Sequence, residues 1–379
     1  ESMSGITTTG STIINDVESM PEGILIWRGL LQWIGGVGII VMAISIFPVL
    51  QVGGMQVFRT ESSETTEKIL PRTAQVASAV ILIYVILTLF CMISYWIGGM
   101  KLFDAISHSL TTIATGGFST KNDSFASFNG NSLEYIAIVF MVLSSLPILI
   151  YLEVIRNGIK RIIYDTQIIT FLGIILFSSL FVIFYLWIQE IKDLEPSIRQ
   201  GAFNVISIIT GTGYTSDNFN LWGPFPIYLI FFGMFIGGCA GSTTCGIKVF
   251  RLQILFETLK MQLQKLLHPH GVFVPHYNHK KIEDGVASSV MSFFFIFILS
   301  FIIITLLLSV TELDFVTSLS AAATSLANVG PGLGTTIGPE NSFFDISNTA
   351  KWILIFSMLL GRLEILTVLV ILHPSFWKK

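Results

Sequence analysis

Four short glycine turns with hydroxylated neighbours recur along the chain, and their residue types suit the binding of a dehydrated cation. One reads Ile-Thr-Gly-Thr-Gly-Tyr-Thr at residues 209–215, and its relatives span residues 7–12, 115–120 and 328–332. A cation filter replaces the ion's hydration shell with backbone carbonyl oxygens that point to one axis. Glycine permits the backbone angles that such a strand requires. The turns therefore predict four strands of carbonyl ligands around a single pore.

The spacing of the turns indicates an internal repeat. If Gly10, Gly117, Gly213 and Gly330 are equivalent, the intervals between them are 107, 96 and 117 residues. A period near one hundred with one turn in each unit is typical of a fourfold repeat. Any single turn could instead be an ordinary loop or a packing glycine. Four turns, each between a short amphipathic segment and an apolar run, disfavour that alternative.

Composition places the chain in a membrane. It has 379 residues, of which 52% are hydrophobic and 12% charged, and its mean hydropathy is +0.75. Several runs exceed the roughly 18 to 20 apolar residues that span a bilayer, whereas an outer-membrane barrel would show segments of about ten alternating residues. The three cysteines lie in apolar or small-residue runs, which argues against disulfides and against a metal site. We expect an all-α polytopic membrane protein.

Each unit is predicted to contain a helix, a re-entrant half-helix, an extended turn and a second helix. The second unit has the full pattern, with a spanning helix over 73–97, a half-helix over 103–114 and a second spanning helix over 133–155. The third unit repeats it over 167–188, 198–209 and 226–250, and the fourth over 286–310, 315–327 and 352–372. Non-helical backbone at membrane depth is tolerated only where it lines a water-filled path, so fourfold pseudo-symmetry around one central pore is expected. The predicted parts are repeat 1 (1–50), a cytoplasmic loop (51–72), repeat 2 (73–161), repeat 3 (162–253), a second cytoplasmic loop (254–283) and repeat 4 (284–379).

The basic residues predict the orientation. Fourteen of the 21 lysines and arginines fall on one side of this topology, among them Arg156, Lys160, Lys260 and Lys281, and the positive-inside rule assigns that side to the cytoplasm. The glycine turns then lie near the outer face, where acidic residues outnumber basic ones. An acidic entrance would concentrate cations.

Two further features carry alternatives that the residues alone leave open. The segment 237–246, rich in glycine, serine and threonine, is either a close-packing seam of small residues or a flexible break across the pore. Arg362 is a full charge in an apolar helix, which indicates either function or a buried ion pair, with Glu153 as the candidate partner. Glu364 is a poor partner because residues two apart do not share a helix face.

These segments together resemble the membrane subunits of the Trk, Ktr and HKT superfamily of potassium transporters, and within it the bacterial TrkH type. The resemblance covers essentially the whole chain. It is carried by SGITTTGST (4–12), LQWIGGVGIIV (31–41), GGFST (116–120), FIGGCAGSTTCGIKVFR (235–251), NVGPGLG (328–334), AKWILI (350–355) and GRLEI (361–365). Family members also carry an N-terminal region and a first spanning helix. Since this chain begins at Glu1 and reaches a turn at once, we expect it to be N-terminally truncated.

The resemblance implies potassium uptake through a carbonyl-lined selectivity filter, with one key glycine in each repeat. The implied filter positions are Thr8, Thr9, Gly10, Thr115, Gly116, Gly117, Thr212, Gly213, Asn328, Val329 and Gly330, with potassium at Gly10, Gly117, Gly213 and Gly330. It also implies that segment 237–246 is an intramembrane gating loop in repeat 3, through Gly237, Gly238, Gly241, Ser242, Thr243 and Gly246, and that Arg362 narrows the pore below the filter. Thr244 and Cys245 depart from the family pattern, in which glycines are common there.

The resemblance further implies how such a protein works in the cell. It would be a multi-pass protein of the bacterial inner membrane, in contact with lipid and not with nucleic acid, and a homodimer with one pore in each protomer. A cytosolic nucleotide-binding ring of TrkA type would regulate it. No enzymatic activity is expected, and no cofactor beyond the transported K⁺.

Two other classes of protein fit the sequence less well. A secondary transporter of another solute or cation would show inverted repeats, whereas these repeats run in one orientation. A membrane enzyme or respiratory subunit would need paired intramembrane acids or histidines, and this chain has few. The histidines at 268–279 are interpreted as solvated loop residues and His108 as a hydrogen-bonded packing residue.

Overall fold

The computed structural model describes residues 1–45, 73–128, 130–278, 280–283, 285–372 and 374–377. The predicted loop 51–72 therefore lies outside the described residues. Among those that are described, four helices are long and apolar enough to cross a membrane, and one bent pair makes a fifth candidate. The four are Glu22–Met42, Ala77–Ile97, Thr166–Ile188 and Val286–Ser309. A mostly helical, polytopic fold is as the sequence predicts.

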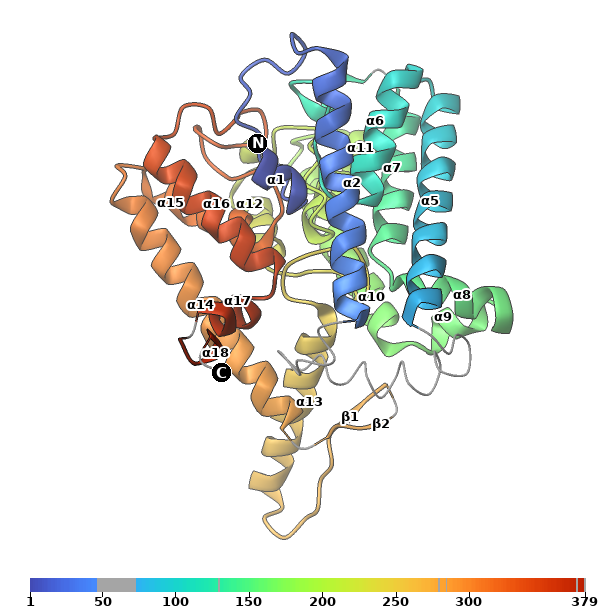
Figure 1. Cartoon of the computed structure of the whole chain (residues 1–379), viewed down its shortest axis with the longest axis vertical. Helices are drawn as coiled ribbons and strands as arrows, with labels where there is room; N and C mark the ends of the chain where they lie inside the picture. The colour runs from blue at the N-terminus through green and yellow to red at the C-terminus, as the bar shows by residue number, and fades with distance from the viewer. Residues whose placement is uncertain (46–72, 129, 279, 284, 373, 378–379) are drawn as a thin grey trace.

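The helices form a bundle from which one helical hairpin projects (Figure 1). The N-terminal part contains α1 (Ser2–Ile6) and α2 (Glu22–Ser45); α5 (Thr73–Ile97), α6 (Leu102–Ile113), η2 (Ser124–Ser127), α7 (Asn131–Ser144), α8 (Ile148–Asn157) and α9 (Lys160–Tyr164) follow. The third part contains α10 (Thr166–Ile188), α11 (Leu194–Ile209), η3 (Phe219–Leu221), α12 (Pro224–Gly233) and α13 (Val249–Leu267). The strands β1 (His276–Tyr277) and β2 (Lys280–Lys281) pair antiparallel, and α14 (Val286–Ser309), α15 (Phe315–Ala327), α16 (Asn348–Arg362), α17 (Ile365–Leu372) and α18 (Pro374–Trp377) complete the chain.

Short polar caps start several of these helices where the sequence turns. The Asp165 carboxylate accepts from the backbone N–H groups of Gln167 and Ile168 at the start of α10. The Asp314 carboxylate accepts from Thr317 at the start of α15, and the Ser347 hydroxyl accepts from Ala350 at the start of α16. These bonds satisfy N–H groups that have no partner inside the helix. The caps set where the short helices begin.

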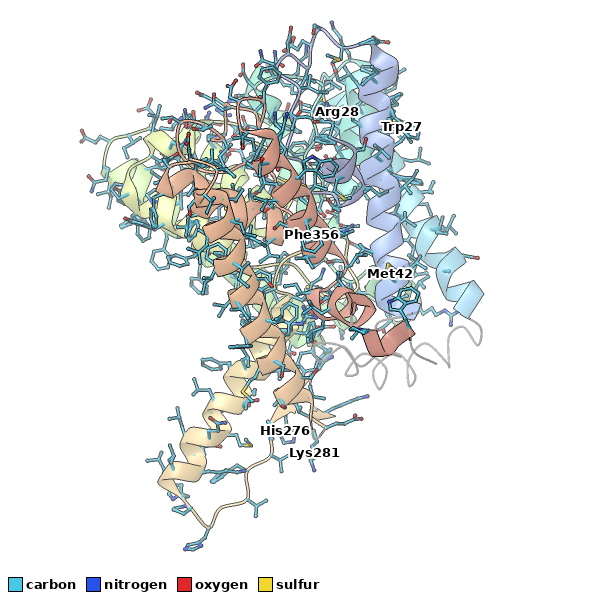
Figure 2. All side chains as sticks on the ribbon, turned by 60° about the vertical axis from the view of Figure 1, so that its left-hand side comes forward. Trp27, Arg28, Met42, His276, Lys281 and Phe356 are labelled. Carbon is cyan, nitrogen blue, oxygen red and sulfur yellow. The ribbon has the colours of Figure 1, made fainter. Side chains whose placement is uncertain are left out.

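The long helices turn large apolar side chains outward. Phe90 on α5, Phe177 on α10 and Phe295 on α14 are 61%, 63% and 69% exposed. So large an apolar surface marks contact with lipid or with another protein. Figure 2 shows Trp27 on α2 near one end of the bundle, with His276 and Lys281 on the projecting hairpin at the other.

Three predicted spanning helices are broken. The prediction of one helix over 133–155 is wrong: α7 ends at Ser144, α8 begins at Ile148, and the two meet at 87°. Pro147 stands at this corner, where its missing N–H cannot continue the helix. The helix predicted over 226–250 is interrupted between Gly233 and Val249, so the close-packing helical seam is excluded there. The helix predicted over 352–372 is broken at Leu363 and Glu364, and Glu364 has a φ of 61°.

Candidate ion pathway

The four glycine turns share one backbone conformation. In each turn the glycine has positive φ, at 85° for Gly10, 76° for Gly117, 78° for Gly213 and 118° for Gly330. The residue two positions earlier is also left-handed in every turn, with φ between 50° and 69°: Thr8, Thr115, Gly211 and Asn328. In an ordinary strand successive carbonyls point to opposite sides, and a left-handed residue at alternate positions turns them to the same side. Positive φ is uncommon in residues other than glycine and marks a constrained site when it persists.

The glycines form a closed ring. A methyl group added to each of them would strike the carbonyl oxygen of the residue that precedes the next glycine in the ring. The distance from the added methyl carbon to that carbonyl oxygen is 2.3 Å for Gly10 and Gly116, and 1.9 Å for Gly117 and Thr212. It is 1.9 Å for Gly213 and Val329, and 2.9 Å for Gly330 and Thr9. The chain thus returns from the fourth turn to the first. The tertiary structure brings these glycines together with Thr8, Thr9, Thr115, Gly116, Thr212, Asn328 and Val329.

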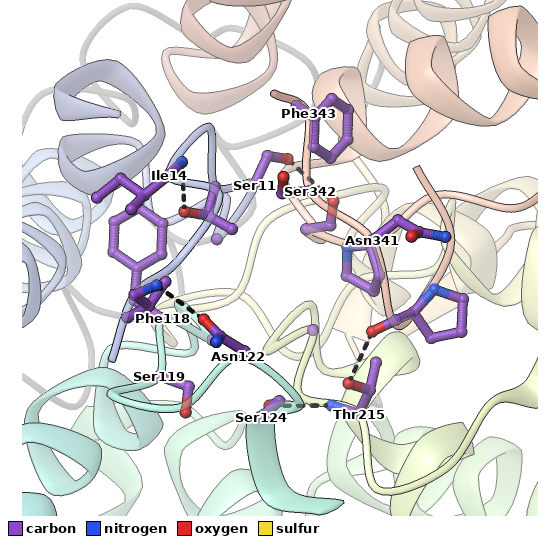
Figure 3. A pocket seen from close by; sticks show the side chains of 18 of the residues that line it. Ser11, Ile14, Phe118, Ser119, Asn122, Ser124, Thr215, Asn341, Ser342 and Phe343 are labelled. Carbon is purple, nitrogen blue, oxygen red and sulfur yellow. Dashed lines mark hydrogen bonds between the residues drawn. The ribbon is translucent and has the colours of Figure 1, made fainter. Parts of the chain in front are cut away.

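A cavity of about 170 Å³ opens over one side of this ring (Figure 3). All four glycines line it, together with polar residues such as Ser11, Ser119 and Asn122. Its charged residues are two basic, Arg28 and Lys121, and two acidic, Glu340 and Asp345. The lining is therefore balanced in charge and does not show the acidic excess predicted for the outer side. The segments around the cavity carry acidic residues such as Asp16 and Glu18.

Asn122 ties two of those segments together at the rim of the cavity. Its side-chain oxygen accepts from the Val17 backbone N–H at 2.7 Å, and its amide donates to the Asp16 carboxylate at 3.0 Å. This hydrogen bond lowers the pKa of Asp16 below its usual value. Asp16 therefore stays charged beside the entrance.

Gln32 and Arg28, two side chains of α2 that the sequence reading missed, hold the second turn. The Gln32 amide donates to the carbonyl oxygen of Gly116 at 2.5 Å, and its oxygen accepts from the Phe118 N–H at 3.1 Å. Arg28 donates to the Ser119 carbonyl at 3.0 Å and pairs with Glu1 at 2.7 Å. The sequence contained a signal for this contact, because Arg28 and Gln32 are four residues apart in an apolar helix and so lie on one face.

His108 supports the same turn from the other side. Its Nδ1 lies 2.8 Å from the Asp104 carbonyl and its Nε2 lies 3.0 Å from the Ser119 hydroxyl. The ring also packs edge-on against Phe125 and Phe128. The interpretation of His108 as a hydrogen-bonded packing residue is confirmed.

The interrupted segment between α12 and α13 is a compact non-helical loop. Its two ends are joined by a bridge between Ile236 and Ile247, and Gly241 and Gly246 have φ of 75° and 70°. A methyl group on Gly237 would lie 1.9 Å from the carbonyl oxygen of Cys245. The predicted residues Gly237, Gly238, Gly241, Ser242, Thr243 and Gly246 all belong to this loop.

The loop lies against the turns on the side opposite the cavity. The Thr115 hydroxyl donates to the Thr243 hydroxyl at 3.2 Å, and the Thr8 hydroxyl lies 4.0 Å from the Cys245 sulfur. Both threonines precede their ring glycine by two residues. Along the axis the order is therefore cavity, glycine ring, threonines, loop.

Arg362 reaches the same loop. Its guanidinium donates to the Thr243 carbonyl at 3.1 Å, to the Gly35 carbonyl at 2.8 Å and to the Cys245 sulfur at 2.5 Å. None of these acceptors is a carboxylate, so the alternative of an ion pair with Glu153 is wrong. Glu364 pairs instead with Arg251 of α13, at 2.7 Å. A second cavity, of about 30 Å³, lies between Arg362 and the loop residues Gly241, Thr244 and Cys245.

The described part of the chain contains no group of three or more His, Cys, Asp or Glu arranged to hold a metal ion. His279, one of the loop histidines, lies outside the described residues. The arrangement of the turns offers carbonyl and hydroxyl oxygens instead, which suit a hard, weakly held cation.

Comparison with known proteins finds cation transport proteins that match along the whole chain. The family model TrkH, described as a cation transport protein, matches residues 1–379. The Trk system potassium uptake protein TrkI of Halomonas elongata is 44% identical over 383 aligned positions, which cover 100% of this chain and 77% of the relative. The Trk system potassium uptake protein TrkH of Escherichia coli K12 is 37% identical, with 100% and 79% covered.

A solved structure has the same fold. The crystal structure of the potassium transporter TrkH from Vibrio parahaemolyticus superposes with a TM-score of 0.89 at 36% identity, covering 99% of this chain and 77% of that one. The relatives are transporters and not enzymes.

Proposed function

Because this chain belongs to the TrkH family of cation transport proteins, we propose that it carries potassium into the cell through a filter made by its four glycine turns. The observation that carries the proposal is the closed ring, in which each glycine packs on the carbonyl before the next. Such a ring presents four carbonyl groups at one level. That arrangement can replace the hydration shell of a potassium ion with carbonyl oxygens.

The filter residues have two roles. The carbonyls of Thr9, Gly116, Thr212 and Val329 lie at the level of the ring and would bind the ion, while Gly10, Gly117, Gly213 and Gly330 leave room for them. Thr8, Thr115 and Asn328 precede the ring with left-handed backbone. Their carbonyls would form the next level of ligands toward the loop.

The loop at 237–246 would act as the gate. It lies against Thr8 and Thr115 and is hydrogen-bonded to Arg362, so an ion that leaves the filter meets it first. The Arg362 guanidinium would add electrostatic repulsion to this barrier. Movement of the loop away from the turns would open the path.

The cellular setting follows from the family. The protein would be a multi-pass protein of the inner membrane and would work with other Trk components, as a homodimer that binds a cytosolic ring of TrkA type. The proposed units of the pathway are residues 1–50, 73–161, 162–253 and 284–379, with connecting loops at 51–72 and 254–283. The basic helix α13 and the hairpin that follows it would face this cytosolic partner, through Lys260, Lys265, Lys280 and Lys281.

The test is cation flux through the protein purified into liposomes under a set gradient, for potassium and for sodium. Potassium-selective flux that Gly213→Ser degrades would support the filter. Absence of flux for either ion, with the cytosolic partner added, would overturn the proposal and favour transport of another solute.

A further inference from the structure

The helices α8 and α9 form a surface that the ion pathway does not use. Because α8 meets α7 at 87°, it projects sideways from the bundle beside one end of α5 (Figure 1). The end of α8, the turn after it and α9 present four large side chains to the outside. The exposed fractions are 78% for Ile155, 69% for Ile159, 66% for Ile163 and 65% for Tyr164. Arg156 and Lys160 are exposed among them. These six residues are called the elbow surface below.

The elbow surface has the composition of a helix that lies on a membrane. Large isoleucines left in water would be unfavourable, whereas the boundary between headgroups and acyl chains accepts an apolar row with a tyrosine beside it. Arginine and lysine can bury their stems there and keep their charges among the headgroups. Residues 148–164 carry three basic residues and one acidic residue, so the partner that fits is an anionic lipid surface.

The inner end of the same elbow holds the loop. The Cys239 N–H donates to the Ser145 carbonyl at 3.0 Å, and the Thr243 hydroxyl donates to the Ser144 carbonyl at 3.1 Å. In return, the Ile148 N–H donates to the Gly241 carbonyl at 3.0 Å. Three hydrogen bonds thus join the corner between α7 and α8 to the segment beneath the turns. A displacement of α8 would therefore strain the bonds that hold that segment.

We propose that the elbow surface binds anionic phospholipid headgroups of the cytoplasmic leaflet, and that this contact holds the loop against the filter turns. The coupling to the loop rests on the gating role proposed above, whereas the lipid contact does not. Loss of anionic lipid should therefore loosen the loop and raise basal potassium flux. A lipid is the partner that fits, because the exposed apolar residues and the basic residues of this surface lie together at the end of the bundle.

The lipid contact is tested by fluorescence quenching in vesicles that contain no partner protein. Cys91, Cys239 and Cys245 are buried, so Ile163→Cys offers an exposed thiol for a fluorescent label. Brominated phosphatidylglycerol should quench the label more strongly than brominated phosphatidylcholine. Each basic residue near an anionic surface contributes about 1 kcal/mol, about fivefold, so Arg156→Gln with Lys160→Gln should lower this preference up to about twenty-five-fold. Added salt should weaken it as well.

Two matched variants serve as controls. Lys260→Gln with Lys265→Gln removes the same charge from α13 and should leave the preference unchanged. Arg156→Lys with Lys160→Arg keeps the charge on the elbow and should also preserve it. The coupling is tested by potassium flux in vesicles with and without phosphatidylglycerol, where the wild type and both controls should respond to the lipid and the glutamine elbow variant should not.

Each outcome decides part of the proposal. Equal quenching by both lipids overturns the preference for anionic headgroups, and quenching by neither would indicate that protein covers the surface, which overturns the proposal entirely. Selective quenching with flux that ignores phosphatidylglycerol overturns the coupling to the loop. A Gly213→Ser variant with unaltered ion selectivity would reject the filter and leave the quenching result standing.

Discussion

The Cα of Gly213 lies directly against the carbonyl oxygen of Val329, so that a methyl group on Gly213 would come within 1.9 Å of that oxygen. The contact joins the third turn to the fourth. It leaves no space for a side chain at Gly213, and any substitution must displace the carbonyl that we assign to the ion. This relationship makes Gly213 the sharpest test of the filter.

We expect Gly213→Ser to lower the potassium-to-sodium permeability ratio about tenfold, since a displaced carbonyl forfeits a contact to a charged group of roughly 1.5 kcal/mol or more. The ratio is measured from reversal potentials of the reconstituted protein. Gly173→Ser on α10 is the matched control, because a methyl group there would meet nothing within 4 Å. A ratio equal to that of the control would remove Gly213 from the filter.

Arg362→Ala should raise ion flux and weaken gating, because it removes a positive charge, two hydrogen bonds to the loop and one to the Gly35 carbonyl of α2. Arg362→Lys should give an ion flux between those of the wild type and Arg362→Ala, since lysine keeps the charge but cannot reproduce three divergent hydrogen bonds. Single-channel conductance and open probability are the readouts. If both stay at wild-type values in Arg362→Ala, the arginine does not act in the pathway.

Gln32→Leu should reduce ion selectivity without abolishing flux. Gln32 is completely buried, and leucine of similar size would leave the Gly116 carbonyl and the Phe118 N–H without their partner, at about 1 to 3 kcal/mol for each group. The second turn would then move relative to the other three. Permeability ratios measured beside Gln262→Leu, an exposed control on α13, check this. Equal ratios in the two variants would assign Gln32 to packing alone.

The Arg251–Glu364 pair should stabilise the fold around the break between α16 and α17. Arg251 is fully buried and Glu364 is 11% exposed, so Glu364→Gln is expected to lower the free energy of unfolding by about 3 kcal/mol, because it removes the carboxylate charge that faces a buried guanidinium. Arg251→Met combined with Glu364→Gln should cost less than the sum of the single changes. Additive losses in thermal unfolding, measured for the wild type, the two single variants and the double variant, would argue against the pair.

The cap of α15 predicts a pH dependence. The hydrogen bond from Thr317 holds the pKa of Asp314 below its usual 3.8, so its contribution is present above that pH and is lost as pH falls through the lower, folded-state pKa. Asp314→Ala should therefore reduce thermal stability at neutral pH by about 0.5 to 1 kcal/mol, lessened by solvent exposure. The difference from the wild type should vanish in strong acid, whereas Asp314→Asn, which can still accept the bond, should lose little. A difference that persists in acid would exclude the carboxylate.

Local patterns predicted much of the fold because each relevant signal lies within a few residues. The apolar runs gave α5, α10 and α14 to within one residue at their ends, and the segment predicted at 315–327 is α15. The broken helices were harder. Pro147 is a visible local cause, whereas Leu363 and Glu364 at the break between α16 and α17 are neither proline nor glycine, and Glu364 pairs there with Arg251 from another helix. Gln32 was missed for the same reason, because its role exists only where α2 meets the second turn.

Hydropathy and glycine spacing establish a helical membrane protein with four similar glycine turns, because both are properties of short stretches of chain. The folded structure alone shows that the turns close into a ring, that the loop lies beneath them, and that Arg362 meets carbonyls and a thiol instead of a carboxylate. Those relationships join residues as far apart as Gly35 and Arg362, separated by 327 positions. They depend on how helices pack in three dimensions, and no local pattern contains that information.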